Sequence, residues 1–235
     1  MPPAAPASAA ATTRLEVPRV ANAEVAVAQR IASGGDFFDA ALTPSGLLMF
    51  MMLDISGRNC EALFAPLQKA FRDCAARLFS IGGNDSEALA QLAVDFNREL
   101  LRASSGVRCT AGFIGCFDPE VGALWYVNAG HTPAIVHDGE CKLLPAGGVP
   151  LGLFAYATRE AQVYVLQPGA AFAAISKGTV EEEGFELVQA AAVVAEHRSA
   201  GAGQICDALL SAARPTKRNK SPQDQTVMVL VRHSS

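Results

Sequence analysis

The pattern of apolar and polar residues predicts a hairpin of two buried strands early in the chain. Residues 47–53 form an unbroken apolar run, which is typical of a strand covered on both faces. A tight turn at residues 44–46 precedes this run, and a second apolar stretch leads from Gly34 into the turn. Asp36 stands near the start of the first strand and Asp54 ends the second. The pattern therefore predicts two acids at the mouth of the hairpin.

Apolar residues spaced by three and four predict two helices directly after the hairpin. The first spans residues 60–80, and the second extends to about residue 100 from candidate N-caps at residues 84–86. Alternation and turn residues then predict strands at 110–117, 123–128, 134–137, 141–144, 161–166, 170–176 and 226–231, two further helices at 184–197 and 203–213, and a first strand within 14–32. Strands and helix pairs in this order favour antiparallel sheets with helices packed outside them, so we expect an α+β sandwich.

Composition and charge narrow the class of protein. The chain has 235 residues, of which 50% are hydrophobic, which suits one well-filled domain over residues 14–235. Residues 1–13 are rich in Pro and Ala and are predicted to be a disordered tail. A net charge of −4 gives no electrostatic case for nucleic acid. No apolar run is long enough to span a membrane and no secretory signal is evident, so we expect a cytoplasmic protein with no membrane partner.

The six cysteines show neither a CxxC motif nor a metal-ligand spacing, and most fall within apolar segments. We therefore expect free, buried thiols in a reducing compartment, and no zinc site.

The two acids of the hairpin carry the first indication of chemistry. Carboxylates brought together at Asp36 and Asp54 repel each other, so such a site requires a metal ion or a basic side chain. The alternative interpretation is that both are turn residues, since Asp next to Gly is common in turns.

Seven stretches, taken in order, resemble one protein family. They are GGDFFD (34–39), LDISGRN (53–59), FNRELL (96–101), FDPEVGALWYVNAGHTPAIV (117–136), GVPLGLF (148–154), LQPGAAFAAISKGTVEE (166–182) and QDQTVMVLV (223–231). From about residue 25 onward, the chain is similar to the SpoIIE/RsbU branch of the metal-dependent PPM (PP2C-like) protein serine/threonine phosphatases. The resemblance implies two antiparallel sheets flanked by helix pairs, and two Mn²⁺ or Mg²⁺ ions whose bridging water attacks a phosphoserine or phosphothreonine.

The resemblance also implies which residues form the site. Asp36 matches the acid of the first motif, Asp54 matches the bridging acid of the second, and the carbonyl group of Ile55 matches the backbone ligand that follows. The residues that the resemblance places in supporting positions are Gly35, Asp39, Gly57 and Gly178.

Two other acids of the family's metal site are replaced in this chain. The Thr-Asp-Gly motif reads Ser-Lys-Gly here, so Lys177 stands where an aspartate ligand is expected. In the closing motif Gln223 takes the place of the ligand, and Asp224 follows it; only a one-residue slip would make Asp224 a ligand. The exchange of Asp for Lys adds two charges and of Asp for Gln adds one, so the site changes by +3. Two unit charges about 4 Å apart interact by ~4 kcal/mol at an effective dielectric constant of 20, so the ammonium group of Lys177 would repel a divalent metal ion at this distance.

Two arrangements of this altered site remain open. In the first, the ammonium group of Lys177 forms a salt bridge in place of the metal ions and balances Asp36 and Asp54. In the second, Lys177 extends into solvent and leaves room for one weakly held ion. The expected cofactor is therefore Mn²⁺ or Mg²⁺ by resemblance, with one ion or none bound.

Two functions follow from the resemblance. The first is a phosphatase with impaired catalysis that acts on a small phosphorylated regulatory protein, such as an anti-sigma-factor antagonist. The second is a pseudophosphatase that docks or sequesters such a partner without hydrolysing it. The sequence leaves the oligomeric state open, a dimer included.

Several other features are more consistent with structure than with chemistry. Asn128 and His131 are expected to shape the end of a core strand. The helix pair 60–103 is expected to pack on the core, with transmission of partner binding as the alternative. A basic run at 214–220 is expected to be a solvated loop, and the acids at 181–183 are expected in the first turn of a helix.

Overall fold

The computed structural model describes residues 11–32, 34–57, 60–79, 85–103, 109–156, 159–180, 185–213 and 223–233. The strands are β1 (Thr13–Leu15), β2 (Ala23–Arg30), β3 (Asp36–Leu42), β4 (Leu48–Ile55), β5 (Thr110–Phe117), β6 (Ala123–Ala129), β7 (Ala134–Asp138), β8 (Glu140–Leu144), β9 (Gln162–Val165), β10 (Ala171–Ile175) and β11 (Gln225–Arg232). The helices are the 3₁₀-helix η1 (Cys60–Leu63), α1 (Phe64–Phe79), α2 (Asp85–Ala103), α3 (Lys177–Val180), α4 (Leu187–Glu196) and α5 (Ala202–Ala212).

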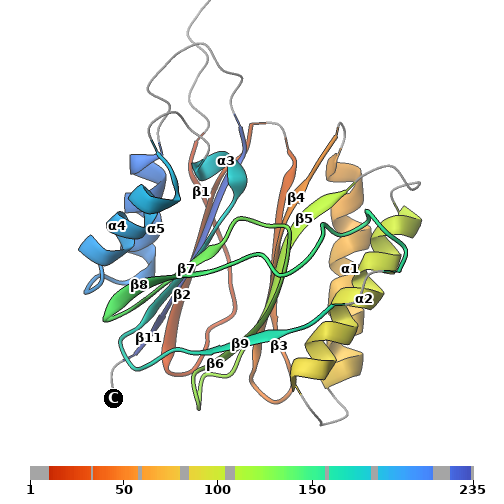
Figure 1. The fold of residues 1–235 in the computed structure, drawn as a ribbon, viewed down its shortest axis with the longest axis horizontal. Coiled ribbons are helices and arrows are strands. Elements are labelled where there is room, and N and C mark those ends of the chain that lie inside the picture. The colour runs from red at the N-terminus through yellow and green to blue at the C-terminus, as the bar shows by residue number, and fades with distance from the viewer. Residues whose placement is uncertain are drawn as a thin grey trace, which may run out of the picture.

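The strands form two antiparallel sheets. One sheet has the order β1-β2-β11-β10-β7-β8, and the other has the order β3-β4-β5-β6-β9. The two sheets pack face to face, with α4 and α5 outside the first and α1 and α2 outside the second (Figure 1). Three apolar clusters fill the three spaces between these four layers. The fold is thus the predicted α+β sandwich with helix pairs on its outer faces.

The central hairpin follows the sequence pattern closely. β3 and β4 pair through the predicted turn, and Asp36 lies opposite Asp54 in their register. Along β4, Leu48, Phe50 and Met52 face the space between the sheets, and the residues between them face α1 and α2. Both faces of β4 are therefore buried, which explains its unbroken apolar run. Asp36 and Asp54 continue the inner face, so both point between the two sheets.

The structure confirms the predicted strands and helices to within a few residues and adds two short elements. β1 and the four-residue helix α3 were not anticipated. All six cysteines are free thiols, as expected, and four of them are buried. Most of the predicted tail, Asn84, the acids at 181–183 and the basic run at 214–220 lie outside the described residues. Within the described residues, no helix combines the length and apolar character that a membrane crossing requires.

One ion pair fixes the helix pair against the hairpin. Asp39 lies on the face of β3 opposite to Asp36, and its carboxylate accepts hydrogen bonds from Arg72 of α1 at 2.7 and 2.9 Å. The Asp39 side chain is 6% exposed, whereas that of Arg72 is 52% exposed. A nearly buried carboxylate thus depends on a cation that reaches in from the surface.

We expect Arg72→Ala to destabilise the fold by about 1–2 kcal/mol, because the carboxylate of Asp39 loses a bidentate partner while solvent screening from the exposed side softens the loss. Urea denaturation measures this change. The control is Lys69→Ala, which removes an exposed ion pair with Asp73 on the same helix and should leave the midpoint unchanged. Equal stability of the Arg72 variant and the wild type would show that water replaces Arg72.

Candidate functional site

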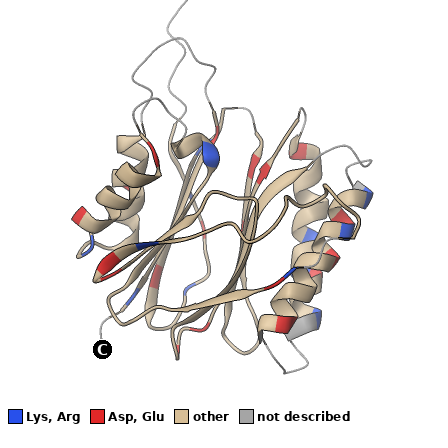
Figure 2. Cartoon of the chain, viewed as in Figure 1, with Lys and Arg blue, Asp and Glu red and all other residues tan. Residues whose placement is uncertain are grey.

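Four sequence motifs meet at one end of the sandwich, which we call the mouth. The segment 34–36, the end of β4, the start of α3 and the start of β11 all reach this end, as the resemblance implies. Acidic positions stand at the ends of β3 and β4, and a basic position stands at α3 across the mouth (Figure 2). The structure therefore brings the predicted site residues together, although up to 190 positions separate them in the sequence.

Asp36 is a buried carboxylate of the mouth, with 5% of its surface exposed. Its side chain accepts a hydrogen bond of 2.7 Å from the hydroxyl group of Thr226. Burial raises the pKa of Asp36 to about 7, and the nearby charges of Asp54 and Asp224 act in the same direction. Hydrogen bonds from Thr226 and Ser176 lower the pKa but do not cancel the effect of burial. Asp36 thus binds a proton readily near neutral pH.

Asp224 is held by backbone N–H groups. One carboxylate oxygen accepts hydrogen bonds from the backbone of Ala32 and Gly34, and the other accepts them from Gly35 and Asp36. Four donors from one short segment form a cradle for an anion. Asp224, which is 5% exposed, therefore anchors the segment that carries Asp36.

The two residues that the resemblance places at acid positions of the family, Lys177 and Gln223, lie next to this network. Lys177 is an exposed residue at the start of α3, and it directly follows the buried Ser176, which bonds to Asp36. Gln223 is exposed and directly precedes Asp224. Gly178 allows α3 to pack closely here, because a Cβ at this position would overlap the backbone carbonyl of Asp224.

The other positions of the second motif are also at the mouth. The backbone N–H of Ile55 donates to the carbonyl oxygen of Gly35 at 2.9 Å, so the two motifs are tied together by main-chain atoms. The carbonyl oxygen of Ile55 accepts a hydrogen bond from the thiol of Cys60 at 3.3 Å. A Cβ at Gly35 would lie 3.0 Å from the same oxygen, so a larger residue would crowd it. Gly57 follows in a backbone conformation with a φ of 130°.

The side chains at the mouth do not fit a cluster of two metal ions. Across the described residues, no group of three or more His, Cys, Asp or Glu side chains is arranged to hold a metal ion. Both oxygens of Asp224 accept backbone hydrogen bonds, and one oxygen of Asp36 accepts the bond from Thr226. Mg²⁺ and Mn²⁺ prefer several hard oxygen ligands, whereas Lys177 supplies a cation and Gln223 a neutral amide.

Asn128 and His131 lie in a turn whose hydrogen bonds join residues of the same short segment. The Asn128 side chain accepts a hydrogen bond from the backbone of His131 at 2.8 Å and donates one to the carbonyl oxygen of Thr132. His131 is 3% exposed, and burial lowers the pKa of its imidazole to about 4. A neutral, buried imidazole in a closed turn agrees with the predicted structural role.

Two residues that bind Asp36 were not singled out from the sequence. Thr226 and Ser176 lie within the motifs that carry the resemblance, but their hydroxyl groups form bonds across strands that only the fold brings together. Asp39, which the resemblance places near the site, points instead toward α1 and is bound by Arg72. Asp39 can therefore affect the mouth through the position of β3, which it helps to fix against α1.

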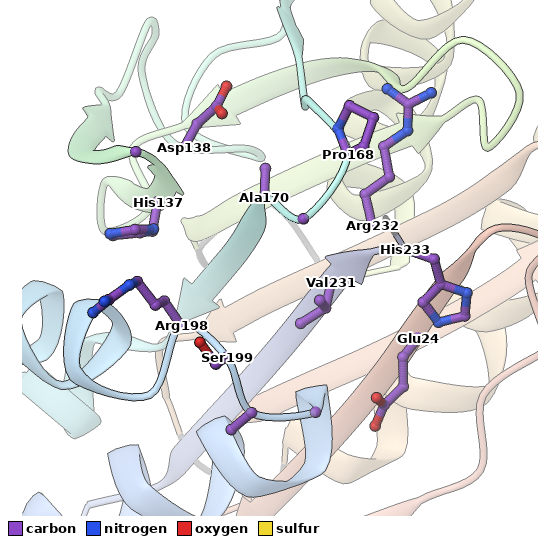
Figure 3. Close-up of a pocket in the computed structure, with 14 residues that line it drawn as sticks. Glu24, His137, Asp138, Pro168, Ala170, Arg198, Ser199, Val231, Arg232 and His233 are labelled. Atoms are coloured by element: carbon purple, nitrogen blue, oxygen red, sulfur yellow. The ribbon is translucent and has the colours of Figure 1, made fainter. Parts of the chain in front are cut away.

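A separate depression of about 790 Å³ opens at the other end of the first sheet (Figure 3). Its charged and titratable lining residues are Glu24, His137, Asp138, Arg198, Arg232 and His233. None of the motif residues of the mouth lines it.

Comparisons with known proteins agree with this arrangement. The family model described as Stage II sporulation protein E (SpoIIE) matches residues 44–233. A comparison with curated proteins finds no match.

Three solved structures illustrate the similarity of fold. The RsbU and RsbW domains of a Mycobacterium tuberculosis protein are 24% identical over 94% of this chain, with a TM-score of 0.70. The PP2C phosphatase domain of Bacillus subtilis SpoIIE, with a fragment of its regulatory domain, is 15% identical over 91% of this chain, with a TM-score of 0.69. This chain spans 64% of the length of each. RsbX in complex with magnesium is 15% identical over 94% of this chain and 99% of its own length, with a TM-score of 0.65.

The family model covers most of the chain, and the solved structures share its two sheets and helix pairs. This chain therefore belongs to the SpoIIE family and has the fold of the PP2C-like phosphatases of the SpoIIE/RsbU type.

Proposed function

We propose that this chain is a cytoplasmic regulator that acts on a small phosphorylated partner-switching protein, such as an anti-sigma-factor antagonist, with impaired hydrolysis. The observation that carries this proposal is the mixed character of the mouth. Asp36 lies opposite Asp54, and Asp224 binds the backbone beside Asp36, whereas the resemblance expects acids at the positions of Lys177 and Gln223.

Charge balance supports the impaired activity. Asp36 lies opposite Asp54 in a buried setting, so the pair needs a proton or a cation. The hydroxyl of Thr226 and the raised pKa of Asp36 supply part of this balance within the protein. We propose that the ammonium group of Lys177 supplies the rest and also attracts the phosphoryl group of the partner.

The alternative is a pseudophosphatase that binds the partner and leaves its phosphate in place. Asp224 favours this alternative, because its carboxylate oxygens already accept four backbone hydrogen bonds and are poorly placed to replace the ligand lost at Gln223. The two proposals share the binding face and differ only in phosphate release.

We expect the wild-type protein to release phosphate slowly, or not at all, from a serine-phosphorylated anti-sigma-factor antagonist in the presence of Mn²⁺. The double substitution Lys177→Asp and Gln223→Asp should raise the rate by about tenfold or more, since even partners of metal ligands affect activity by roughly 10–100-fold. Release of phosphate over time measures both rates.

The matched control for this experiment is Lys142→Asp with Gln167→Asp, which makes the same exchanges at exposed positions away from the mouth. It should leave the rate unchanged. An ordinary phosphatase rate in the wild type that Asp36→Ala abolishes would contradict impaired hydrolysis. Slow but measurable release by the wild type would favour the impaired enzyme, and no release by the wild type would favour the pseudophosphatase.

We expect the contribution of Asp36 to the stability of the metal-free protein to fall as pH rises from about 4 to about 7, whereas the lowered pKa of His131 contributes in the opposite direction. The pKa of Asp36 is about 7 in the folded state and 3.8 without the protein environment, so between these values the folded state binds more protons. Asp36→Asn should remove this part of the slope and stabilise the protein above neutral pH. Urea denaturation across this range measures the effect, with the exposed Asp207→Asn as the control. Equal slopes in the Asp36 variant and the wild type would show that Asp36 is ionised in the folded state.

A further inference from the structure

A chain of buried polar side chains leads from β2 to Asp36. The amide Nε2 of Gln29 donates to the hydroxyl oxygen of Thr226 at 3.1 Å, and the hydroxyl group of Thr226 donates to Oδ2 of Asp36 at 2.7 Å. Gln29 is 8% exposed, Asp36 is 5% exposed and Thr226 is fully buried. Gln29 and Thr226 belong to the first sheet and Asp36 to the second, so the chain joins the two sheets at the mouth.

The register of β2 and β11 places Gln29 beside Thr226. The two residues lie directly opposite each other in this antiparallel pair, so their side chains lie on the same face of the sheet. Met228, two residues after Thr226 on β11, lies in the apolar cluster between the sheets. Because side chains alternate along a strand, Gln29 and Thr226 point into the same space as Asp36.

Each hydroxyl group that binds Asp36 is oriented by another donor. A hydroxyl group has one hydrogen and two lone pairs, so what it offers to a carboxylate depends on its other partner. Because an N–H of Gln29 occupies a lone pair of Thr226, the single hydroxyl hydrogen of Thr226 is left for Asp36. The backbone N–H of Thr226 donates in turn to the hydroxyl oxygen of Ser176 at 2.9 Å, and the Ser176 side chain bonds to Asp36. Thr226 thus orients Ser176, and Gln29 orients Thr226.

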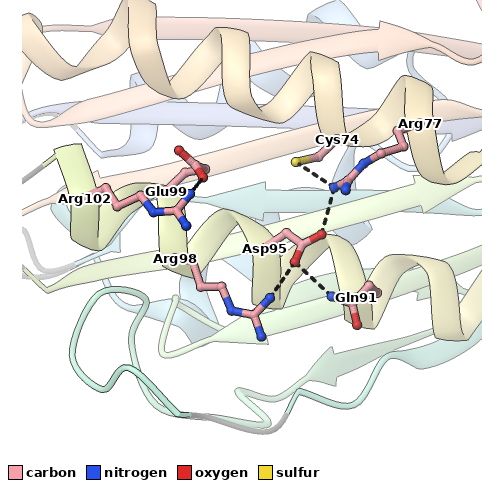
Figure 4. A network of polar contacts seen from close by, with 7 residues as sticks. All are labelled: Cys74, Arg77, Gln91, Asp95, Arg98, Glu99 and Arg102. Carbon is pink, nitrogen blue, oxygen red and sulfur yellow. Dashed lines mark hydrogen bonds and ion pairs between the residues drawn. The ribbon is translucent and has the colours of Figure 1, made fainter.

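The carboxylate of Asp95 on α2 shows why this orientation matters at Asp36. Asp95 accepts hydrogen bonds from Arg77 of α1 at 2.8 Å and from Arg98 of α2 at 3.0 Å (Figure 4). An arginine side chain can only donate, so its role toward a carboxylate is fixed. The side-chain donors of Asp36 among the described residues are neutral hydroxyl groups, which can also accept. A further group must therefore set their direction.

From this arrangement we infer that Gln29 is a positioning residue of the mouth. Acting through Thr226, it fixes the direction of the hydrogen bonds to Asp36 and holds this carboxylate in the orientation that faces the phosphoryl group of the partner. That Asp36 faces such a partner rests on the proposed function, whereas the action of Gln29 on Asp36 does not.

Two other interpretations of the chain are open to test. In the first, Gln29 and Thr226 only join β2 to β11, and Asp36 does not depend on Gln29. In the second, the chain runs in reverse: a protonated Asp36 donates to Thr226, and Thr226 donates to the amide oxygen of Gln29.

The first measurement is the NMR signal of the Asp36 carboxyl carbon in the full chain labelled with carbon-13 aspartate, identified by its loss in Asp36→Asn. Gln29→Leu should shift this signal, because the hydroxyl group of Thr226 can then turn away from Asp36. The matched control is Gln225→Leu, which removes the neighbouring buried amide on the opposite face of β11, where it donates to the carbonyl oxygen of Ala213. This control should leave the signal in place.

The second measurement is a mutant cycle followed by urea denaturation. Gln29→Leu and Asp36→Ala should be coupled by about threefold or more in the unfolding equilibrium constant, although no hydrogen bond joins Gln29 to Asp36 directly in the described part of the chain. Thr226→Val should abolish this coupling, since it keeps the shape of the side chain and removes the connecting hydroxyl group. Gln29→Glu keeps the shape of Gln29 but replaces its donor with an acceptor, so it should destabilise the protein at neutral pH.

The outcomes separate the three interpretations. An Asp36 signal that Gln29→Leu does not move, together with no coupling, would show that Gln29 only joins two strands and would overturn the inference. A Gln29→Glu variant that is more stable than the wild type would show that the chain runs in reverse, which would also overturn it.

Partner binding tests the function of this arrangement separately. Gln29→Leu should raise the Kd for a serine-phosphorylated anti-sigma-factor antagonist by about threefold or more and leave that for the unphosphorylated form unchanged, because a carboxylate that loses a hydrogen-bond donor repels a phosphoryl group more strongly. An unchanged Kd beside a shifted Asp36 signal would overturn the role of Gln29 toward the partner. Failure of the wild type to bind or dephosphorylate the antagonist would overturn the proposed function, and the signal and the coupling would still decide whether Gln29 positions Asp36.

Discussion

Three carboxylates converge at the mouth of the sandwich, and the organisation of this end depends on how each one is compensated. Asp224 is compensated by four backbone N–H groups, which at the same time fix the segment leading into β3. Asp36 is compensated by the hydroxyl of Thr226 and by a readily bound proton. Asp54 lies opposite Asp36 and shares the same inner face. In a site with four acids, metal ions would balance these charges. We propose that Lys177 and Gln223 stand in two of those positions here, so that protein groups balance more of the charge.

Much of the fold could be predicted from the sequence, because the hydrophobic patterns that indicate its main helices and strands are local. The unbroken run in β4 and the three-and-four spacing in α1 and α2 each follow from which faces are buried. β1 and α3 were missed, because three or four residues are too few to show a period. The orientation of Asp39 was readable in principle: it is three residues from Asp36 in a strand, and alternation places the two on opposite faces.

The candidate site could be predicted from the sequence only in part. The resemblance identified the positions of Asp36, Asp54, Lys177 and Gln223, but it gave no indication of what each side chain contacts. The cradle around Asp224 and the bond from Thr226 to Asp36 join residues that are about 190 positions apart, and neither has a local signal. The same holds for Arg159, whose guanidinium donates to the carbonyl oxygens of Val149 and Pro150. Long-range polar contacts of this kind depend on the packing of both sheets.

β5 links the mouth to the segment around Leu151. β5 pairs with the end of β4 on one side, and its first residue, Thr110, exchanges two backbone hydrogen bonds with Leu151. Asn97 of α2 bonds to Gly152 and Phe154 of the same segment, so α2 is connected to the mouth through this segment and β5.

The most direct test of the central claim, that protein groups replace the metal pair at the mouth, is anomalous diffraction from crystals soaked in Mn²⁺. Our account predicts no pair of manganese peaks between Asp36 and Asp54, with the ammonium group of Lys177 directed toward these carboxylates. Two peaks bridging the carboxylates, with the lysine turned away, would contradict it.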